Sequence, residues 1–162
     1  MKATHRSAYN KGSDSVIKMF TDKDYFQQKY ELQGAQDIKL LEHEENGDEF
    51  MVEFERKVPT EVSIPSFAKK LIPSTMTVVQ RDSWNAADKT GRLDIDLKGL
   101  PVEVVCHMHL EDTDTGCDLV MNWELDASVP MMKKKFETLL WEDLRGKMAS
   151  DTEVGNQLLA GY

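Results

Sequence analysis

Two stretches of alternating apolar and polar residues, 102–110 and 117–125, constrain the fold of this chain more than any other feature. A period of two predicts half-buried β-strands, and the turn residues Asp112 to Gly116 between them predict a hairpin. If Asp112 faces Cys117, each apolar residue of one strand meets an apolar residue of the other on the same face. A correct register has this property. The chain is therefore expected to build an antiparallel sheet with one apolar face.

The same reading predicts further elements along the chain. Five more strands are expected at 2–9, 37–43, 50–58, 75–86 and 91–98. Two short helices should follow the first strand, and Ser128–Pro130 should open a long C-terminal helix. We expect this helix to bend at Gly146 or break near Gly155, with Trp141 off its apolar stripe. The stripe recurs at i, i+3/i+4 spacing and consists of Met132, Phe136, Leu139, Leu140 and Leu144.

A sheet with one apolar face needs a second layer, and the C-terminal helix is the only long amphipathic element. The predicted fold is α+β: a curved, seven-stranded antiparallel sheet wrapped around that helix. The two short helices should close one end, which leaves a cavity between sheet and helix. No repeat or change of composition divides the chain, so residues 1–162 are predicted to form a single domain.

This order of elements resembles the helix-grip fold of the START and polyketide-cyclase-like superfamily (SRPBCC). Details over the whole chain resemble a bacterial branch of it that has no known function. These details are Lys29–Gly34 (KYELQG), Leu71–Pro73, Trp84 and Gly99–Pro101. The resemblance implies a START-like domain that binds a lipid or another hydrophobic ligand. A minority of the superfamily are cyclases or dehydratases, and some members contact partner proteins.

The charge balance restricts the partners. Twenty Lys and Arg stand against 29 Asp and Glu, a formal net charge of −9. Such a chain is poorly suited to nucleic acid or to an anionic membrane surface. No apolar run approaches the ~20 residues of a membrane span, and residues 1–12 lack a secretory signal. We expect a cytoplasmic protein that handles a hydrophobic small molecule or lipid; the oligomeric state is not indicated.

The hairpin register also separates the two cysteines. Cys106 and Cys117 lie six ladder positions apart, roughly 20 Å at ~3.3 Å per residue. A disulfide requires Cα atoms within about 7 Å. No disulfide is therefore expected, which agrees with a reducing cytoplasm.

Polar residues whose positions in the alternating pattern turn them toward the inner face of the sheet are the candidates for ligand recognition. The parity that buries Met76 and Val78 also turns Gln80 and Asp82 inward. Arg56 lies on the inner face of the neighbouring strand and is expected to meet Asp82, either as a structural ion pair or as an anchor for a ligand head. On the long helix, Asp143 and Lys147 fall in the apolar sector. The predicted ligand-binding residues are Arg56, Val78, Gln80, Asp82, Trp84, Met108, Met121, Trp123, Phe136, Leu140 and Asp143.

Two other functions stay open beside ligand binding. An enzyme of the cyclase or dehydratase type would use Asp82 or Asp143 as a general acid or base. An interaction module would use the outer sheet face around His107, Val120 and Asn122.

No cofactor is expected, because the chain contains no Gly-rich phosphate loop, CxxC or HExxH motif. His107 and His109 share a strand face, but no carboxylate or thiolate accompanies them there at a metal-binding spacing. We therefore interpret both as residues of a solvated outer face. Segment 59–73, which contains three prolines and a short helical patch, is either a lid over the cavity or a plain connection.

Overall fold

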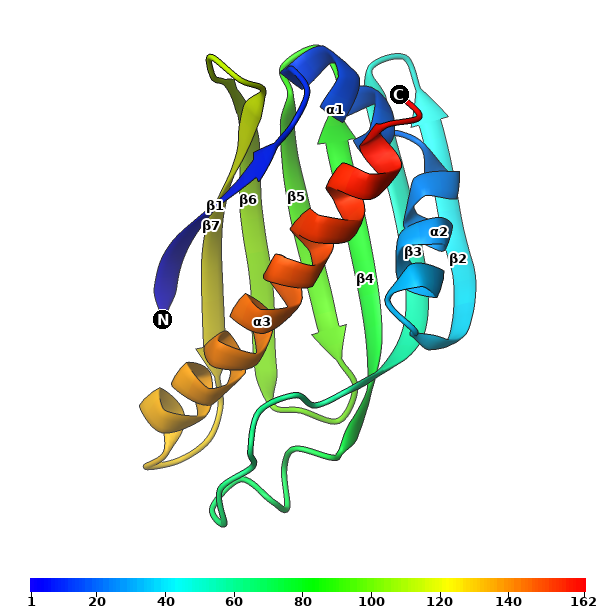
Figure 1. Cartoon of the computed structure of the whole chain (residues 1–162). Helices are drawn as coiled ribbons and strands as arrows, with labels where there is room; N and C mark the ends of the chain where they lie inside the picture. Colours follow the sequence, from blue (N-terminus) through cyan, green and yellow to red (C-terminus); the bar gives the residue numbers. More distant parts are fainter.

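The computed structural model describes all 162 residues and contains seven strands and three helices (Figure 1). The sheet order is β1-β7-β6-β5-β4-β3-β2, and every neighbouring pair is antiparallel. The strands are β1 (Lys2–Tyr9), β2 (Gln36–Asn46), β3 (Glu49–Pro59), β4 (Thr75–Asn85), β5 (Thr90–Leu97), β6 (Val102–Asp112) and β7 (Cys117–Ala127). The helices are α1 (Ser13–Phe20), α2 (Lys23–Leu32) and α3 (Lys133–Leu159).

The long helix α3 runs diagonally across one face of the sheet, and α1 and α2 lie on the same side near its C-terminal end (Figure 1). Its backbone comes close to β1, β7, α1 and α2, but not to the central strands β4 and β5. This arrangement is the helix-grip fold, and it confirms the predicted fold class.

The β6–β7 hairpin has the predicted register. Asp112 pairs with Cys117, and Cys106 pairs with Trp123. Both cysteines are buried free thiols. Because the register determines which side chains face the helix, the inner face of these strands is also as predicted.

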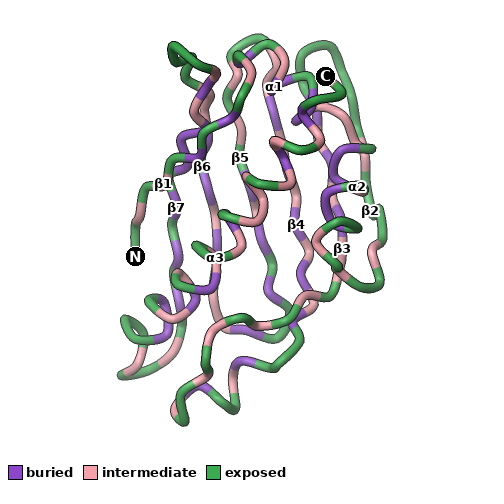
Figure 2. Tube along the Cα trace, in the orientation of Figure 1, coloured by how far each residue is buried: buried purple, intermediate pink, exposed green.

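The core lies between the sheet and the three helices, and buried positions alternate with more exposed ones along most strands (Figure 2). Helices α1 and α2 add Phe20, Tyr25, Phe26 and Tyr30 to this core, where their rings pack on one another and on the strands. The apolar residues at alternating positions of β3 to β7 are buried: Phe50, Val52, Phe54, Met76, Val78, Trp84, Leu93, Ile95, Leu97, Met108, Met121 and Trp123.

Several predicted boundaries were wrong. The last helix begins at Lys133 rather than at Ser128–Pro130, since Met131 has a positive φ of 63° that interrupts the helical path. Segment 59–73 forms turns and no α-helix. Trp141 does not point away from the core, because its ring meets that of Trp123 edge-on with centroids 6.3 Å apart.

The long helix passes through both of its internal glycines without a break. At Gly155 it lies against two tyrosines, and a Cβ there would be 2.9 Å from Tyr9 Cε1 and 3.5 Å from Tyr25 Oη. At Gly146 an added Cβ would meet only the Glu61 carboxylate, at 3.5 Å. The close approach of α3 therefore depends on Gly155.

The outer face of the sheet carries charges of both signs in cross-strand pairs. Arg6 bonds Glu111, and Arg81 bonds Glu53. The large apolar side chains that are exposed are Met1, Leu32, Leu40, Leu41 and Met131. None of them lies on β6 or β7, and Val120 is itself buried, so these strands do not form the apolar docking patch of an interaction module.

The two helix glycines supply a matched stability test. We expect Gly146→Ala to stabilise the protein by roughly 0.5–1 kcal/mol, because alanine favours a helix over glycine. Gly155→Ala should instead destabilise by roughly 1–3 kcal/mol, since the methyl group would force Tyr9 out of its packed position. Urea unfolding measures both values. Equal effects of the two substitutions would contradict the close approach at Gly155.

Candidate functional site

Two adjoining cavities lie between the sheet and α3. The larger has a volume of about 130 Å³ and the smaller about 40 Å³. They share five lining residues and are therefore neighbouring compartments: Gln80, Leu93, Met121, Met148 and Asp151. The backbone of α3 comes close to the sheet at β1 and β7, and the two cavities lie beside these contacts.

Ten of the eleven residues predicted to bind a ligand line one of these cavities. Arg56, Val78, Gln80, Met121, Trp123, Leu140 and Asp143 line the larger one. Asp82, Trp84 and Met108 line the smaller one. Phe136 lines neither, because it is completely buried in the core. Strand and helix periodicity thus brought most of the candidates together, and their role in binding remains a prediction.

A chain of hydrogen bonds links the predicted polar residues of β3 and β4. Arg56 Nη2 donates to Gln80 Oε1 at 3.0 Å, and Gln80 Nε2 donates to Asp82 Oδ1 at 2.8 Å. The expected direct contact between Arg56 and Asp82 was therefore wrong. In the actual register Arg56 faces Val78, four residues before Asp82, so Gln80 lies between the two charges.

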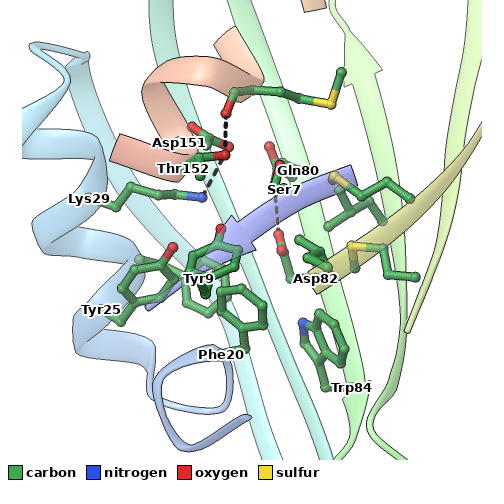
Figure 3. A pocket seen from close by; sticks show the side chains of 16 residues that line it. Ser7, Tyr9, Phe20, Tyr25, Lys29, Gln80, Asp82, Trp84, Asp151 and Thr152 are labelled. Atoms are coloured by element: carbon green, nitrogen blue, oxygen red, sulfur yellow. Dashed lines mark hydrogen bonds and ion pairs between the residues drawn. The ribbon is translucent and has the colours of Figure 1, made fainter. Parts of the chain in front are cut away.

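Lys29 of α2 is buried in the smaller cavity and reaches toward α3 (Figure 3). Its Nζ lies 3.6 Å from Asp151 Oδ2 and 5.0 Å from the centre of the Tyr30 ring. Burial acts to lower the pKa of Lys29, but attraction to Asp151 and Asp82 outweighs it, and the pKa is raised. Lys29 is therefore an ammonium ion that supplies positive charge to the cavity and is a poor nucleophile.

Asp82 is the buried carboxyl group of the smaller cavity and lies beside Gln80 on β4 (Figure 3). Burial raises its pKa to about 6, although Lys29, Gln80 and Arg56 favour the charged form. A carboxyl group that titrates near neutral pH can both give and take a proton, which is the property of a general acid or base.

In the lining of the larger cavity, Asp143 connects α3 to segment 59–73. Its carboxylate accepts hydrogen bonds from Lys147 Nζ and from the backbone N–H of Glu61, the latter at 2.9 Å. Ala68 and Ile72 of the segment are buried. These contacts hold the start of the segment beside the larger cavity, which is compatible with both a lid and a plain connection.

Sequence reasoning missed Lys29 and Asp151. Lys29 follows Tyr25 by four residues and Phe26 by three, so helical periodicity places it on the apolar face of α2. Asp151 follows Lys147 by four residues, so it lies on the same side of α3 as Asp143 and Lys147, which the sequence placed in the apolar sector of that helix. The same periodicity argument that found Gln80 and Asp82 on a strand would have found both.

His107 and His109 lie on the outer face of β6. His109 contacts Glu111 at 2.9 Å, and His107 is exposed. No group of three His, Cys, Asp or Glu side chains has an arrangement that could hold a metal ion. No helix has the length and hydropathy needed to span a bilayer.

Comparison with known proteins supplies the family. Residues 4–159 match the family described as "Protein of unknown function (DUF2505)". The chain belongs to this family. No curated protein matches the chain. The resemblance to a branch of unknown function is confirmed.

Solved structures similar to this DUF2505 protein share its fold at low sequence identity. Ara h 8.0201 has a TM-score of 0.65 and 13% identity, with 100% of this chain and 99% of that chain covered. Norcoclaurine synthase from Thalictrum flavum, in complex with dopamine and hydroxybenzaldehyde, has a TM-score of 0.65 and 15% identity over 100% and 87%. The ZhuI aromatase/cyclase from Streptomyces sp. R1128 has a TM-score of 0.60 and 10% identity, with 98% of this chain and 95% of that chain covered. These neighbours confirm the helix-grip fold.

The raised pKa of Asp82 predicts a pH-dependent stability in this DUF2505 protein. Because the pKa is about 6 in the folded state against 3.8 ordinarily, the folded state binds the proton more tightly. Stability from this group is thus fully present below pH ~4 and is lost as the pH rises to ~6, a change of about 3 kcal/mol. Asp82→Asn should remove this loss, so the stability of the variant relative to wild type should rise between pH ~4 and pH ~6.

Urea unfolding of both proteins at intervals from pH 4 to 8 measures the difference. Asp96→Asn, which alters an exposed carboxylate paired with Lys98, is the control and should run parallel to wild type. An Asp82→Asn curve that also ran parallel to wild type would show that burial does not perturb Asp82.

Proposed function

We propose that this protein binds a hydrophobic or lipid-like small molecule in the larger cavity between the sheet and α3. The observation that carries the proposal is the cavity itself, about 130 Å³ with 12 hydrophobic residues among its 21 lining residues. Protein interiors rarely keep voids larger than a water molecule. A space of this volume is large enough to admit part of a small molecule. A bound ligand would bury the apolar lining from water.

The composition of the lining supports an adaptable site. Met76, Met121 and Met148 contribute unbranched thioether side chains, which accommodate ligands of irregular shape. Mostly apolar walls with a few polar groups are typical of small-molecule sites. A norcoclaurine synthase of the same fold is in complex with dopamine and hydroxybenzaldehyde, which supports small-molecule binding by this architecture but leaves the ligand here unspecified.

The proposal includes a cytoplasmic location. Cys106 and Cys117 are free thiols, and thiols persist in reducing compartments.

Filling the cavity tests the proposal. We expect native mass spectrometry of the purified protein to detect a bound small molecule, and the neutral dye phenylnaphthylamine to fluoresce on binding. Val78→Phe, which projects a larger ring into the cavity, should weaken dye binding at least tenfold. Val79→Phe alters the next residue of β4, whose side chain points to the opposite face, and should leave the affinity unchanged. The proposal would be overturned if the purified protein carried no small molecule and bound no dye.

A second candidate function is acid–base catalysis on the bound molecule, of the cyclase or dehydratase type. The observation that favours it is a buried carboxyl group, Asp82, with its pKa raised to about 6 beside the ammonium of Lys29. Asp143 is less suited, since Lys147 and the Glu61 amide already occupy its oxygens.

Proton exchange tests this second candidate. In heavy water, a catalytic Asp82 should exchange the methyl protons of bound acetylnaphthalene, taking a proton from carbon and returning a deuteron. Asp82→Asn should lower the exchange rate at least tenfold while the ketone still binds. Exchange no faster than in buffer would exclude this role for Asp82 on that ketone and leave the binding function intact.

A further inference from the structure

The cavity contains buried hydrogen-bond donors that the protein leaves without acceptors. Three buried side-chain polar atoms have no partner: Tyr30 Oη, Arg56 Nη1 and Trp123 Nε1. Arg56 and Trp123 both line the larger cavity, and their nitrogens can only donate. A molecule that fills this cavity and satisfies them must therefore supply acceptor atoms.

Arg56 also lacks a counter-charge. Its guanidinium lies over the Tyr30 ring, 4.0 Å from the ring centre, and its hydrogen-bond partner is the neutral amide of Gln80. No carboxylate oxygen lies within ion-pair distance of it. A largely desolvated cation without an anion is unfavourable, and an anion brought beside it would relieve that penalty.

The acids around the cavity are engaged elsewhere. Asp151 pairs with Lys29 and accepts from Gln33, and Asp143 binds Lys147 and the Glu61 amide. The Glu61 carboxylate lies beside Gly146 of α3 and makes no ion pair with Arg56. Asp82 reaches Arg56 only through Gln80, so no carboxylate of the protein pairs with Arg56 directly.

The hydrogen-bond chain from Asp82 holds Arg56 in place. Gln80 donates to Asp82 through Nε2, so its Oε1 is turned toward Arg56 and accepts from Nη2. Nη1 is buried and has no hydrogen-bond partner. A planar guanidinium held in one orientation is suited to the two oxygens of a carboxylate or sulfonate.

From these contacts we infer that the ligand is an amphipathic organic anion, whose carboxylate or similar head group binds Arg56 while its apolar body lies along Val78, Ile95 and Leu97. Trp123 lies on β7, on the far side of the cavity from β3, and donates to a second oxygen of the ligand where one is present. The inference rests on the proposed binding function and adds the chemical class of the ligand.

A pair of dyes that differ only in charge tests the inference. Anilinonaphthalene sulfonate carries the anion, and phenylnaphthylamine is the same molecule without the sulfonate. Wild type should bind the anionic dye at least tenfold more tightly than the neutral one, in fluorescence titrations at constant salt. Arg56→Met should abolish this preference.

Two further variants complete the set. Arg92→Met removes an exposed arginine that pairs with Asp94 on the outer face, and it should keep the full preference. Arg56→Lys keeps the charge but loses the planar fork, and it should keep part of the preference. Thermal melting identifies a variant that fails to fold; should Arg56→Met do so, Arg56→Lys decides, and an unchanged preference in it contradicts the inference.

The outcomes separate the two proposals. If neither dye binds wild type, the binding function itself fails. If both dyes bind equally, or Arg56→Met retains the preference, the cavity binds small molecules but Arg56 does not select anions. Only a preference that depends on Arg56 supports the inference.

Discussion

The long helix α3 crosses the face of the sheet that α1 and α2 also cover, and most of the site depends on where α3 touches the sheet. At its C-terminal end, the missing side chain of Gly155 lets α3 lie directly on Tyr9 and Tyr25. Near its N-terminal end, Trp141 meets Trp123 of β7. Between these contacts the backbone of α3 stays away from β4 and β5, so side chains alone must fill the gap. The side chains fill this gap incompletely, and the space that they leave forms the two cavities.

Much of this could be predicted from the sequence because strand parity is a local property. Alternation turned Gln80, Asp82 and Trp84 inward without knowledge of any other strand. The contact expected between Arg56 and Asp82 failed because it depends on the register of β3 against β4. No turn fixes that register, since the fifteen residues between Pro59 and Thr75 connect the two strands. The β6–β7 register was predictable because a short turn and a complete set of apolar pairs determine it.

Lys29 and Asp151 illustrate a different limit. Each lies on the inward sector of its own helix, which periodicity can indicate. Their contact, however, joins α2 to α3 across the core, and it exists only once both helices have packed on the sheet. Helix boundaries show the same dependence: Ser128–Pro130 carries good starting signals, yet the left-handed conformation at Met131 delays the helix to Lys133.

The charges of the protein divide into two populations. Most of the acidic excess lies on strand exteriors and turns, where water and neighbouring cations solvate it and where it carries no information about a ligand. The cavity holds a small set in which Lys29 and Asp151 are paired while Arg56 is not. Desolvation makes this inner set energetically important, because unpaired charge in a low-dielectric interior is unfavourable.

Asp82 connects the two roles considered for the cavity. Through Gln80 it holds Arg56 in position, and through its burial it titrates near pH 6. An anion bound at Arg56 would offset the positive charge that now stabilises ionised Asp82, and the pKa of Asp82 would rise further. Ligand binding and proton uptake at Asp82 are therefore linked, and each must strengthen the other by the same free energy. If the site only binds, its affinity for the anion falls as Asp82 ionises. If the site also catalyses, binding of the anionic substrate protonates Asp82 and so prepares it to act as the general acid.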